Sequence, residues 1–233
     1  MVGVLTRMKL TVMRRIITGP RSGNIAGGAA LGLAAAIGTI VLATLDTAQP
    51  SMLMDLLAVV FGIWALGWAL GPAYGGQPVL RAEHFNLQPI PRRRLALSLL
   101  GTGFVGIAPV VTLVAFSALL VFAARLGVVP FLVALPGLAL QLVLVVLLSR
   151  LAAHLLGALA RSRVGGAISA LIMALMLVAA SSGWIVFVAL DVLLDFGFSR
   201  NFSLTVRSLP SSWPLLAVEA SARADWRLSL IHI

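Results

Sequence analysis

The sequence predicts an all-α, polytopic helical membrane protein with five transmembrane helices. Five apolar stretches occupy residues 25–45, 52–70, 97–122, 128–148 and 167–190. Each is close to or longer than the ~20 residues that a helix rising ~1.5 Å per residue needs to cross the hydrocarbon core of a bilayer. Hydrophobic residues make up 61% of the chain and charged residues 10%, and the mean hydropathy is +1.09. A soluble domain has no use for five helices that are apolar on every face, so residues 1–227 are expected to form one transmembrane domain.

The basic residues divide the loops into two sets, and this division predicts the orientation. The first loop has no basic residue and the third has only Arg125. The N-terminal segment and the second and fourth loops carry most of the others: Arg7, Lys9, Arg14, Arg15, Arg21, Arg81, Arg92, Arg93, Arg94, Arg150, Arg161 and Arg163. Under the positive-inside rule these parts are cytoplasmic and residues 191–227 are outside. The outer segment does contain Arg residues, but longer loops follow the rule less strictly.

The N-terminal segment, residues 1–24, is too long for a cleaved signal peptide, so the first span is expected to be retained. Leu5, Met8, Val12 and Ile16 fall on one helical face, opposite a basic face. A basic amphipathic helix beside a first span is typical of a cytoplasmic helix that lies in the plane of the membrane. The alternative is a mobile basic tail.

Small residues and prolines predict how the spans pack. Gly28, Gly32 and Ala36 are four residues apart in the first span, and Gly67 and Gly71 are four apart at the end of the second. This spacing lets helix backbones approach closely in lipid. Pro109 and Pro136 lie inside the third and fourth spans, where each removes a backbone donor and is expected to kink its helix. Trp68, Tyr74, Trp213 and Trp226 are expected in the interfacial belts.

Polar side chains within membrane spans are the usual functional candidates. Gln141 lies well inside the fourth span, and Asp55 lies one turn into the second, near the predicted outer surface. Asp191 and Asp195 are four residues apart just past the fifth span and therefore share a helix face. A cation or catalytic site there is one interpretation. Solvated residues at the point where the helix leaves the membrane are the favoured one.

Other chemistries are not predicted. His84 and His154 have no second histidine at metal-ligand spacing and the chain has no Cys, so neither a metal site nor a catalytic centre is expected. The single Lys, Lys9, is not in a Walker A sequence, so any ATP hydrolysis would reside in another polypeptide. The net charge of +10 comes from residues that flank the spans, which favours membrane lipids over nucleic acid as the partner.

The second cytoplasmic loop, residues 71–96, is the most specific stretch. Its sequence GPAYGGQPVLRAEHFNLQPIPRRR leads directly into an apolar helix. Here the chain resembles the permease subunits of ABC exporters of the type 2 superfamily, particularly those of actinobacteria. In these permeases a short helix ending in Leu-x-Pro-Leu/Ile-x-Arg-Arg follows the second span and docks on the ATPase. The resemblance implies that the ATPase-coupling residues are Glu83, His84, Phe85, Asn86, Leu87, Pro89, Arg92, Arg93 and Arg94. For the Arg cluster alone, a positive-inside anchor is the alternative.

The resemblance extends to the order of elements. Residues 191–227 contain LPSSW and then Ala224-Asp225-Trp226, and in similar permeases this outer segment forms short helices that dip into the outer leaflet before a sixth span. The resemblance implies a six-helix unit in the bacterial plasma membrane. The implied partners are a cytoplasmic ABC ATPase, which holds ATP and Mg²⁺, and a second permease unit, either as a homodimer or as a fused second half. No cofactor is implied on this chain.

The C-terminal residues depart from the family pattern. A sixth span is expected to begin near Trp226, whereas the sequence ends seven residues later in LSLIHI. These residues, 228–233, match the translation of a common sequencing adapter, so they are expected to be a library scar on a truncated reading frame. The alternative is a natural short C-terminus after five spans.

The function expected from the residues and the resemblance together is that of a non-enzymatic permease subunit. It would form the substrate path of an ATP-driven exporter. One alternative is a membrane-embedded enzyme that acts on lipids through Asp191 and Asp195. Another is an ion-coupled secondary transporter, which the lack of a carboxylate at the midplane disfavours.

Overall fold

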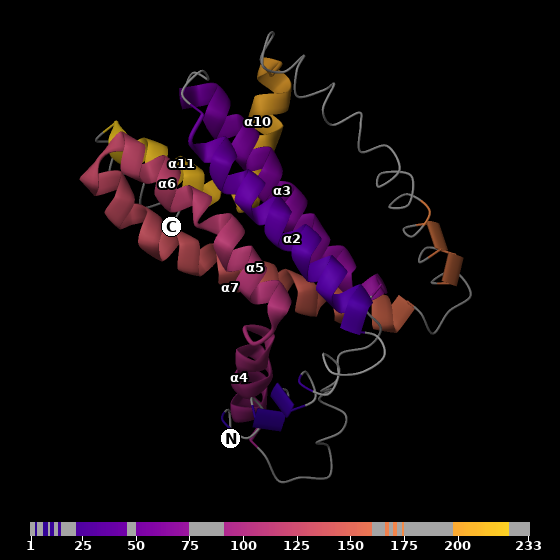
Figure 1. Cartoon of the computed structure of the whole chain (residues 1–233). Coiled ribbons are helices and arrows are strands. Elements are labelled where there is room, and N and C mark those ends of the chain that lie inside the picture. The colour runs from indigo at the N-terminus through magenta and orange to yellow at the C-terminus, as the bar shows by residue number, and fades with distance from the viewer. Residues whose placement is uncertain are drawn as a thin grey trace.

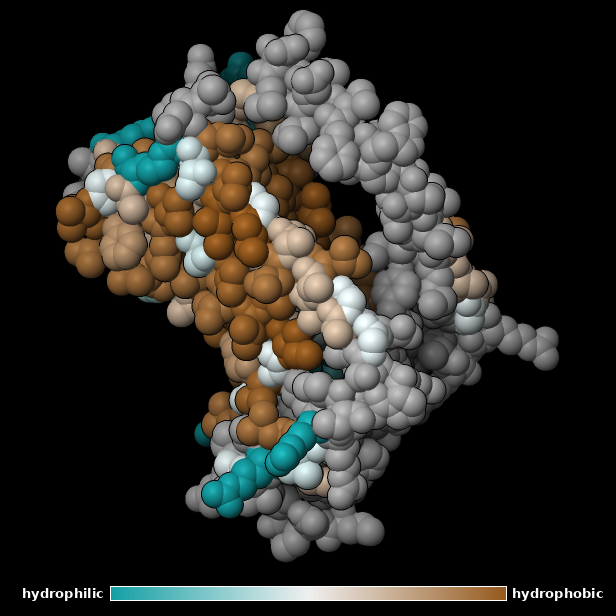
Figure 2. Space-filling model, viewed as in Figure 1, coloured by the Kyte–Doolittle hydropathy of each residue, from teal (hydrophilic) through white to brown (hydrophobic). Residues whose placement is uncertain are grey.

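The computed structural model describes residues 22–45, 50–74, 91–159 and 198–223, with a few single residues between 3 and 14 and between 166 and 174. Within these ranges the chain forms helices and no strand, which confirms the all-α prediction for the described part. Four stretches are long and apolar enough to cross a membrane: Ala26–Ala43, Ser51–Pro72, Ile107–Leu126 and Val128–Leu155. Figure 2 shows their apolar side chains as one continuous surface, with hydrophilic groups gathered toward its ends. The described helices therefore have the length and the apolar surface of membrane-spanning helices.

The first two spans agree with the prediction. Helix α2 covers Ser22–Ala43, and helix α3 covers Pro50–Tyr74 with Pro72 in its last turn. The predicted fifth span, residues 167–190, lies mostly outside the described residues, as does most of the predicted in-plane helix at residues 1–24. The count of five spans therefore stays a prediction, and the described residues contain four candidate spans.

The third predicted span, residues 97–122, has the wrong boundaries. Helix α4 (Arg92–Gly103) ends in a turn, and Gly106 adopts a φ of 150° before α5 (Ile107–Phe116) and α6 (Ala118–Leu126) continue as the membrane-length stretch. Only Gly adopts this backbone conformation without strain. Hydropathy alone missed the break because Gly101, Gly103 and Gly106 interrupt the helix without lowering the mean hydropathy much. Pro109 accordingly falls in the first turn of α5, where a proline is tolerated, and not in a helix interior.

The fourth span continues beyond its predicted end. Helix α7 covers Val128–Leu159, with Pro136 inside it, so it is longer than the predicted 128–148. Arg150, which the sequence analysis assigned to a loop, lies within this helix. The residues that follow Arg150 include Leu and Ala, which are strong helix formers, and the helix therefore does not end at the charge.

The helices form a bundle in which α2 packs on α5, α3 packs on α7, and α6 packs on α7. Figure 1 shows α4 projecting from one end of this bundle, while α10 (Arg200–Ser208) and α11 (Trp213–Ala222) lie toward the other. We call these the open end and the capped end. The core lies toward the capped end, where the rings of Phe61 and Phe116 are 4.9 Å apart between α3 and α5. In lipid, close packing of this kind supplies most of the association energy.

Arg125 ties two helix ends together at the capped end. Its guanidinium donates hydrogen bonds of 3.0 Å to the carbonyl oxygens of Ala43 and Leu45, at the C-terminus of α2. A cation at this position satisfies carbonyls that have no partner within the helix and complements the negative end of the helix dipole. A single residue, Gly127 with a φ of 131°, then separates α6 from α7, so α6 and α7 form a tight helical hairpin.

Candidate functional site

The described residues 198–223, which we call the capping hairpin, are built by local sequence signals. Ser199 caps α10 by accepting a hydrogen bond of 3.4 Å from the backbone N–H of Phe202. Leu209 is extended, as expected for a residue before proline, and ends α10 ahead of the short 3₁₀ helix η2 (Pro210–Ser212). Pro214 lies in the first turn of α11, where its missing N–H costs nothing. The Ser212 hydroxyl lies 2.8 Å from the Arg207 carbonyl oxygen, which fixes the turn.

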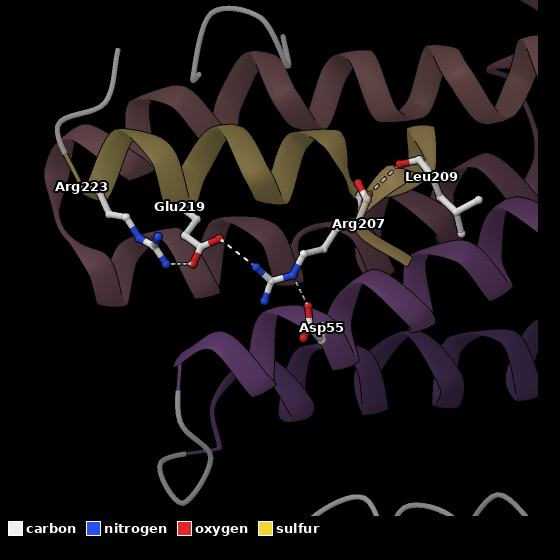
Figure 3. A network of polar contacts seen from close by, with 6 residues as sticks. Asp55, Arg207, Leu209, Glu219 and Arg223 are labelled. Carbon is white, nitrogen blue, oxygen red and sulfur yellow. Dashed lines mark hydrogen bonds and ion pairs between the residues drawn. The ribbon is translucent and has the colours of Figure 1, made fainter. Parts of the chain in front are cut away.

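A chain of ion pairs holds the capping hairpin on α3 (Figure 3). The Arg207 Nε donates to the Asp55 Oδ1 at 2.6 Å, and its Nη1 lies 4.0 Å from the Glu219 Oε2. Glu219 also accepts from Arg223, one turn further along α11. The Asp55 side chain is 8% exposed and the Arg207 side chain 28%. The hydrogen bond to Asp55, together with the charges of Asp55 and Glu219, raises the pKa of Arg207 although burial opposes this.

The tip of the hairpin reaches deep between α3 and α7. The Gln141 Nε2 donates to the Ser211 carbonyl oxygen at 3.1 Å, and Gln141 is 1% exposed. Gln141 is thirteen residues into α7, or about 20 Å along the axis. Two glycines leave room for the hairpin: a Cβ at Gly62 would lie 3.7 Å from the Ser211 Oγ, and one at Gly137 would lie 3.2 Å from the Pro214 Cβ. The hairpin therefore enters from the capped end and returns to it.

Gln141 is therefore a structural contact in this conformation. Sequence analysis placed it inside the fourth span as the single strongly polar side chain there, and the structure gives it a partner on the hairpin. Its Oε1 is buried without a hydrogen-bond partner among the described residues. A buried acceptor left unpaired costs about 1–3 kcal/mol.

A cavity of about 600 Å³ lies toward the open end of the bundle. Its size falls within the ~300–1,000 Å³ range of ligand pockets. Helices α2, α3, α5 and α7 and the end of α4 contribute its walls, which are mostly apolar and unusually rich in glycine. The described lining residues are Gly28, Ala29, Gly32, Trp64, Gly67, Trp68, Gly71, Pro72, Gly103, Ile107, Ala108, Val111, Thr112, Val146, Ser149, Arg150 and Ala153.

The small residues that are spaced four apart in α2 and α3 fall into two groups: some contact a neighbouring helix and others border the cavity. Gly32 lies close to α5, since a Cβ there would be 3.3 Å from the Val111 Cγ1, and Ala36 is fully buried. The prediction of close helix packing is thus confirmed for these two residues. For Gly28, Gly67 and Gly71 close packing stays a prediction, because among the described residues a Cβ at each of them would meet nothing within 4 Å. These three residues widen the cavity.

Two tryptophans on α3 border the cavity and bind across the bundle. The Trp68 Nε1 donates to the Thr112 Oγ1 at 2.8 Å, and the Trp64 Nε1 donates to the Thr39 Oγ1 at 3.3 Å. Each indole N–H is satisfied by a threonine on a neighbouring helix, which is usual for a tryptophan inside a protein. The polar atom of Trp68 therefore points into the bundle, and the place of this residue in an interfacial belt stays a prediction.

Arg150 supplies the charge on the cavity wall. Its Nη2 lies 3.5 Å from the Thr102 Oγ1 at the end of α4. Gly103 permits this approach of α4 to α7, because a Cβ there would lie only 2.7 Å from the Val146 Cγ1 and 3.6 Å from the Arg150 Nη2. Among the described lining residues, Arg150 is the one that carries a charge.

The residues that the sequence analysis proposed for ATPase coupling are mostly not placed. Glu83, His84, Phe85, Asn86, Leu87 and Pro89 lie outside the described residues. Arg92, Arg93 and Arg94 form the first turn of α4, and Arg93 is exposed. Asp191 and Asp195 also lie outside the described residues.

Sequence reasoning missed both the cavity and the clamp between Asp55 and Arg207. Asp55 was noted, but its partner is 152 residues away along the chain, and no local pattern indicates such a pairing. A usable signal existed nonetheless: an Asp within an apolar span requires a cation, and the predicted outer segment is rich in Arg.

The fold and these two features define a class: a helical, membrane-type bundle with a hairpin docked at one end and a cavity toward the other. Comparisons with protein-family models, with curated proteins and with solved structures found no match for this chain.

Proposed function

We propose that the chain is a membrane-spanning permease subunit of an ATP-driven, ABC-type exporter of the bacterial plasma membrane. In this proposal it contributes to a substrate path and couples to a separate cytoplasmic ATPase, which binds ATP and Mg²⁺. A second permease unit completes the path. The observation that carries the proposal is α4, a short helix that begins at Arg92, directly after the Glu83–Pro89 stretch, and projects from the open end of the bundle (Figure 1).

The contacts of α4 suggest how movement would reach the spans. Gly103 at its end packs against Val146 and Arg150 of α7, and a turn through Gly106 connects α4 to α5. A push on the loop before α4 would therefore act on two spans through a helix of 12 residues. The sequence analysis expected one uninterrupted span over residues 97–122. The break at residues 104–106 makes α4 a separate helix, which in this proposal acts as a lever.

The pairing of arginines at the capped end supports placing that end outside the cell. Arg125 caps α2, Arg207 pairs with Asp55, and Arg223 pairs with Glu219. Each of these arginines has a partner within the protein. Arginines at an outer end would normally count against the positive-inside orientation, but paired ones are a weaker argument against it. The exposed Arg93 at the start of α4 lies at the other end, which the proposal places in the cytoplasm.

The clamp also argues against ion coupling through Asp55. A carboxylate that carries a coupling ion must exchange that ion during transport, whereas Asp55 is held by Arg207 at 2.6 Å and is nearly buried. The lipid-enzyme alternative depends on Asp191 and Asp195. Loss of a lipid product when both are replaced by Asn would favour that alternative over the permease.

The coupling role is tested by replacing Glu83 and Phe85 together with Ala. We expect membrane insertion to be unchanged, co-purification of the ATPase to fall, and ATP-dependent export to be lost, because docking would lack its acidic and aromatic contacts. The measurement is ATPase recovery on the tagged permease together with transport in vesicles. His154→Ala serves as the control, since His154 is exposed on α7 outside the proposed docking stretch. Normal ATPase recovery and normal export in the double variant would overturn the docking role.

A further inference from the structure

We propose that the open-end cavity binds one uncharged, mostly apolar molecule that carries an ester or ketone group, with the hydroxyls of Thr112 and Ser149 as hydrogen-bond donors to that group. The inference goes beyond the permease proposal, because it concerns binding by this chain alone and needs no ATPase. It follows from the level of the cavity, from its apolar walls and from two hydroxyl protons that the described part of the protein leaves without an acceptor.

The cavity lies where the apolar stretches of two spans end. On α3 its lining runs from Trp64 to Pro72, the last residue of the apolar stretch. On α7 it runs from Val146 to Ala153, close to the end of the apolar stretch at Leu155. The lining therefore follows the last ~10–12 Å of each span. Hydrocarbon gives way to the polar interface at this level, which suits a molecule with an apolar body and a polar group at one end.

The walls fit an apolar body. Gly67 and Gly71 on α3 and Gly28 on α2 leave open space, within the described residues, where side chains would otherwise stand. The indoles of Trp64 and Trp68 donate their N–H groups to threonines, so their remaining surface is apolar. Walls of this kind hold a ligand by close packing, and a few polar groups fix its orientation.

The walls also favour a ligand without charge. Among the described lining residues Arg150 is the charged one, and its guanidinium is engaged within the protein, in part by Thr102. An ionised ligand group would therefore lose its water without gaining a counter-ion, which costs far more than burial of a neutral polar group. The proposed site accordingly gives Arg150 no role in binding.

Two hydroxyls on the cavity walls supply the polar contacts. A threonine within a helix often donates to the carbonyl one turn earlier, as the Thr39 Oγ1 does to Ala35 at 2.9 Å. Thr112 on α5 is 1% exposed, and its Oγ1 accepts from Trp68 but donates to no group among the described residues. Ser149, on the neighbouring α7, makes no side-chain hydrogen bond within the described ranges.

These two protons select the chemistry of the ligand. A hydroxyl is one donor and two acceptors, so each of the two side chains has its donor left for a bound molecule. An ester or ketone group offers oxygen lone pairs to such donors without bringing a charge. Because a buried donor without an acceptor is costly, an ester gains more in this cavity than a plain hydrocarbon of the same length does.

The test is quenching of tryptophan fluorescence in the purified full chain, held in nanodiscs of ether-linked phosphatidylcholine, a lipid without ester carbonyls to compete. Trp184, Trp213 and Trp226 are replaced by Phe, so that the two cavity tryptophans report alone. The probes are the methyl ester of a dibrominated C18 fatty acid and a dibrominated C18 alkane, compared at equal mole fraction in the bilayer. We expect saturable quenching by both, with the ester bound about tenfold more tightly because of its hydrogen bonds.

Substitutions of the two hydroxyls test the polar contacts. Ser149→Ala and Thr112→Val should each weaken binding of the ester about fivefold and leave the alkane unchanged, whereas Thr112→Ser should keep ester binding. Ser203→Ala, at a serine of α10 outside the cavity, is the control for Ser149. Thr39→Val is the control for Thr112, because it also removes the acceptor of a tryptophan N–H but lies outside the cavity lining.

An obstructing substitution tests the apolar part of the site. Gly67→Leu should weaken both probes at least about tenfold, because the new side chain fills space where the ligand would lie. Gly38→Leu is the matched control, at an exposed glycine of α2 outside the cavity. If Gly67→Leu folds poorly, Gly71→Leu provides the same obstruction.

Each outcome supports or overturns the proposal. Equal affinity for ester and alkane, or equal losses in Thr112→Val and Thr39→Val, would overturn it, since the hydroxyls would then contact no ligand. Equal effects of Gly67→Leu and Gly38→Leu would overturn it as well, because the probes would only be partitioning into the bilayer.

Discussion

Replacing Asp55 with Ala should destabilise the docked capping hairpin by about 2–3 kcal/mol. The change leaves the Arg207 guanidinium partly buried against α3 without its 2.6 Å partner. We place the cost below that of a fully buried pair, because the Arg207 side chain keeps 28% of its surface exposed and water screens part of its charge. The free energy of unfolding in detergent micelles measures this loss.

Docking itself can be measured by a disulfide across the contact. The chain has no Cys, so Gly62→Cys with Ser211→Cys introduces a single pair, at a site where the Gly62 Cβ position lies 3.7 Å from the Ser211 Oγ. The two positions are near enough for a disulfide to form after a small adjustment at the tip of the hairpin. We expect rapid cross-linking in native membranes and a clear reduction when Asp55→Ala is added. As the control, Arg223→Gln should cost no more than about 0.5 kcal/mol, because its pair with Glu219 is an exposed contact within one helix. Equal effects of Asp55→Ala and Arg223→Gln would contradict the clamp.

Replacing Gly137 with a larger residue should push α11 away from α7. A Cβ there would lie 3.2 Å from the Pro214 Cβ, 3.5 Å from the Leu119 Cδ2 and 3.7 Å from the Pro214 Cα. We expect Gly137→Ala to cost about 1 kcal/mol and Gly137→Leu about 3 kcal/mol, because overpacking forces rigid groups to move. Proline and the backbone yield less than the end of a flexible side chain would.

The control for this series is Gly38→Leu. Gly38 is exposed on α2 with nothing within 4 Å of its Cβ position, so the same substitution should leave the unfolding midpoint nearly unchanged. Thermal unfolding of the three variants side by side gives the comparison. A Gly137→Leu protein as stable as Gly38→Leu would mean that the hairpin does not pack against α7 as described.

Hydropathy predicted the spans well where the apolar pattern is local. The stretches that became α2 and α3 were found because each is a long run of apolar residues with polar ends. The same method misplaced the third span and shortened the fourth. Gly101, Gly103 and Gly106 are nearly neutral in hydropathy, yet α4 ends among them. Arg150 lowers the local hydropathy but does not end helix α7. Backbone preference, and not apolarity, decides these boundaries.

The candidate sites were less predictable, for a physical reason. Asp55, Gln141 and Trp68 were each noted from the sequence, but their roles depend on partners that only the fold brings near: Arg207, Ser211 and Thr112. Likewise, glycines at the spacing of a packing motif either contact a neighbouring helix, as Gly32 does, or border a cavity, as Gly67 does. The spacing is identical in the two cases, and the difference lies in what stands opposite.

The permease proposal rests on the orientation of the chain, and one labelling experiment tests it. The chain has no Cys, so single cysteines can be introduced one at a time. Gln49 and the exposed Asn201 are the predicted outer positions, and Gly76 and Ser162 are the predicted cytoplasmic ones. Intact cells are then treated with a membrane-impermeant maleimide, and lysed cells serve as the reference for full reactivity. The account predicts labelling at positions 49 and 201 in intact cells, and at positions 76 and 162 only after lysis. Labelling of position 76 in intact cells would contradict it, because the loop that contains Glu83 and Phe85 would then face away from any cytoplasmic ATPase.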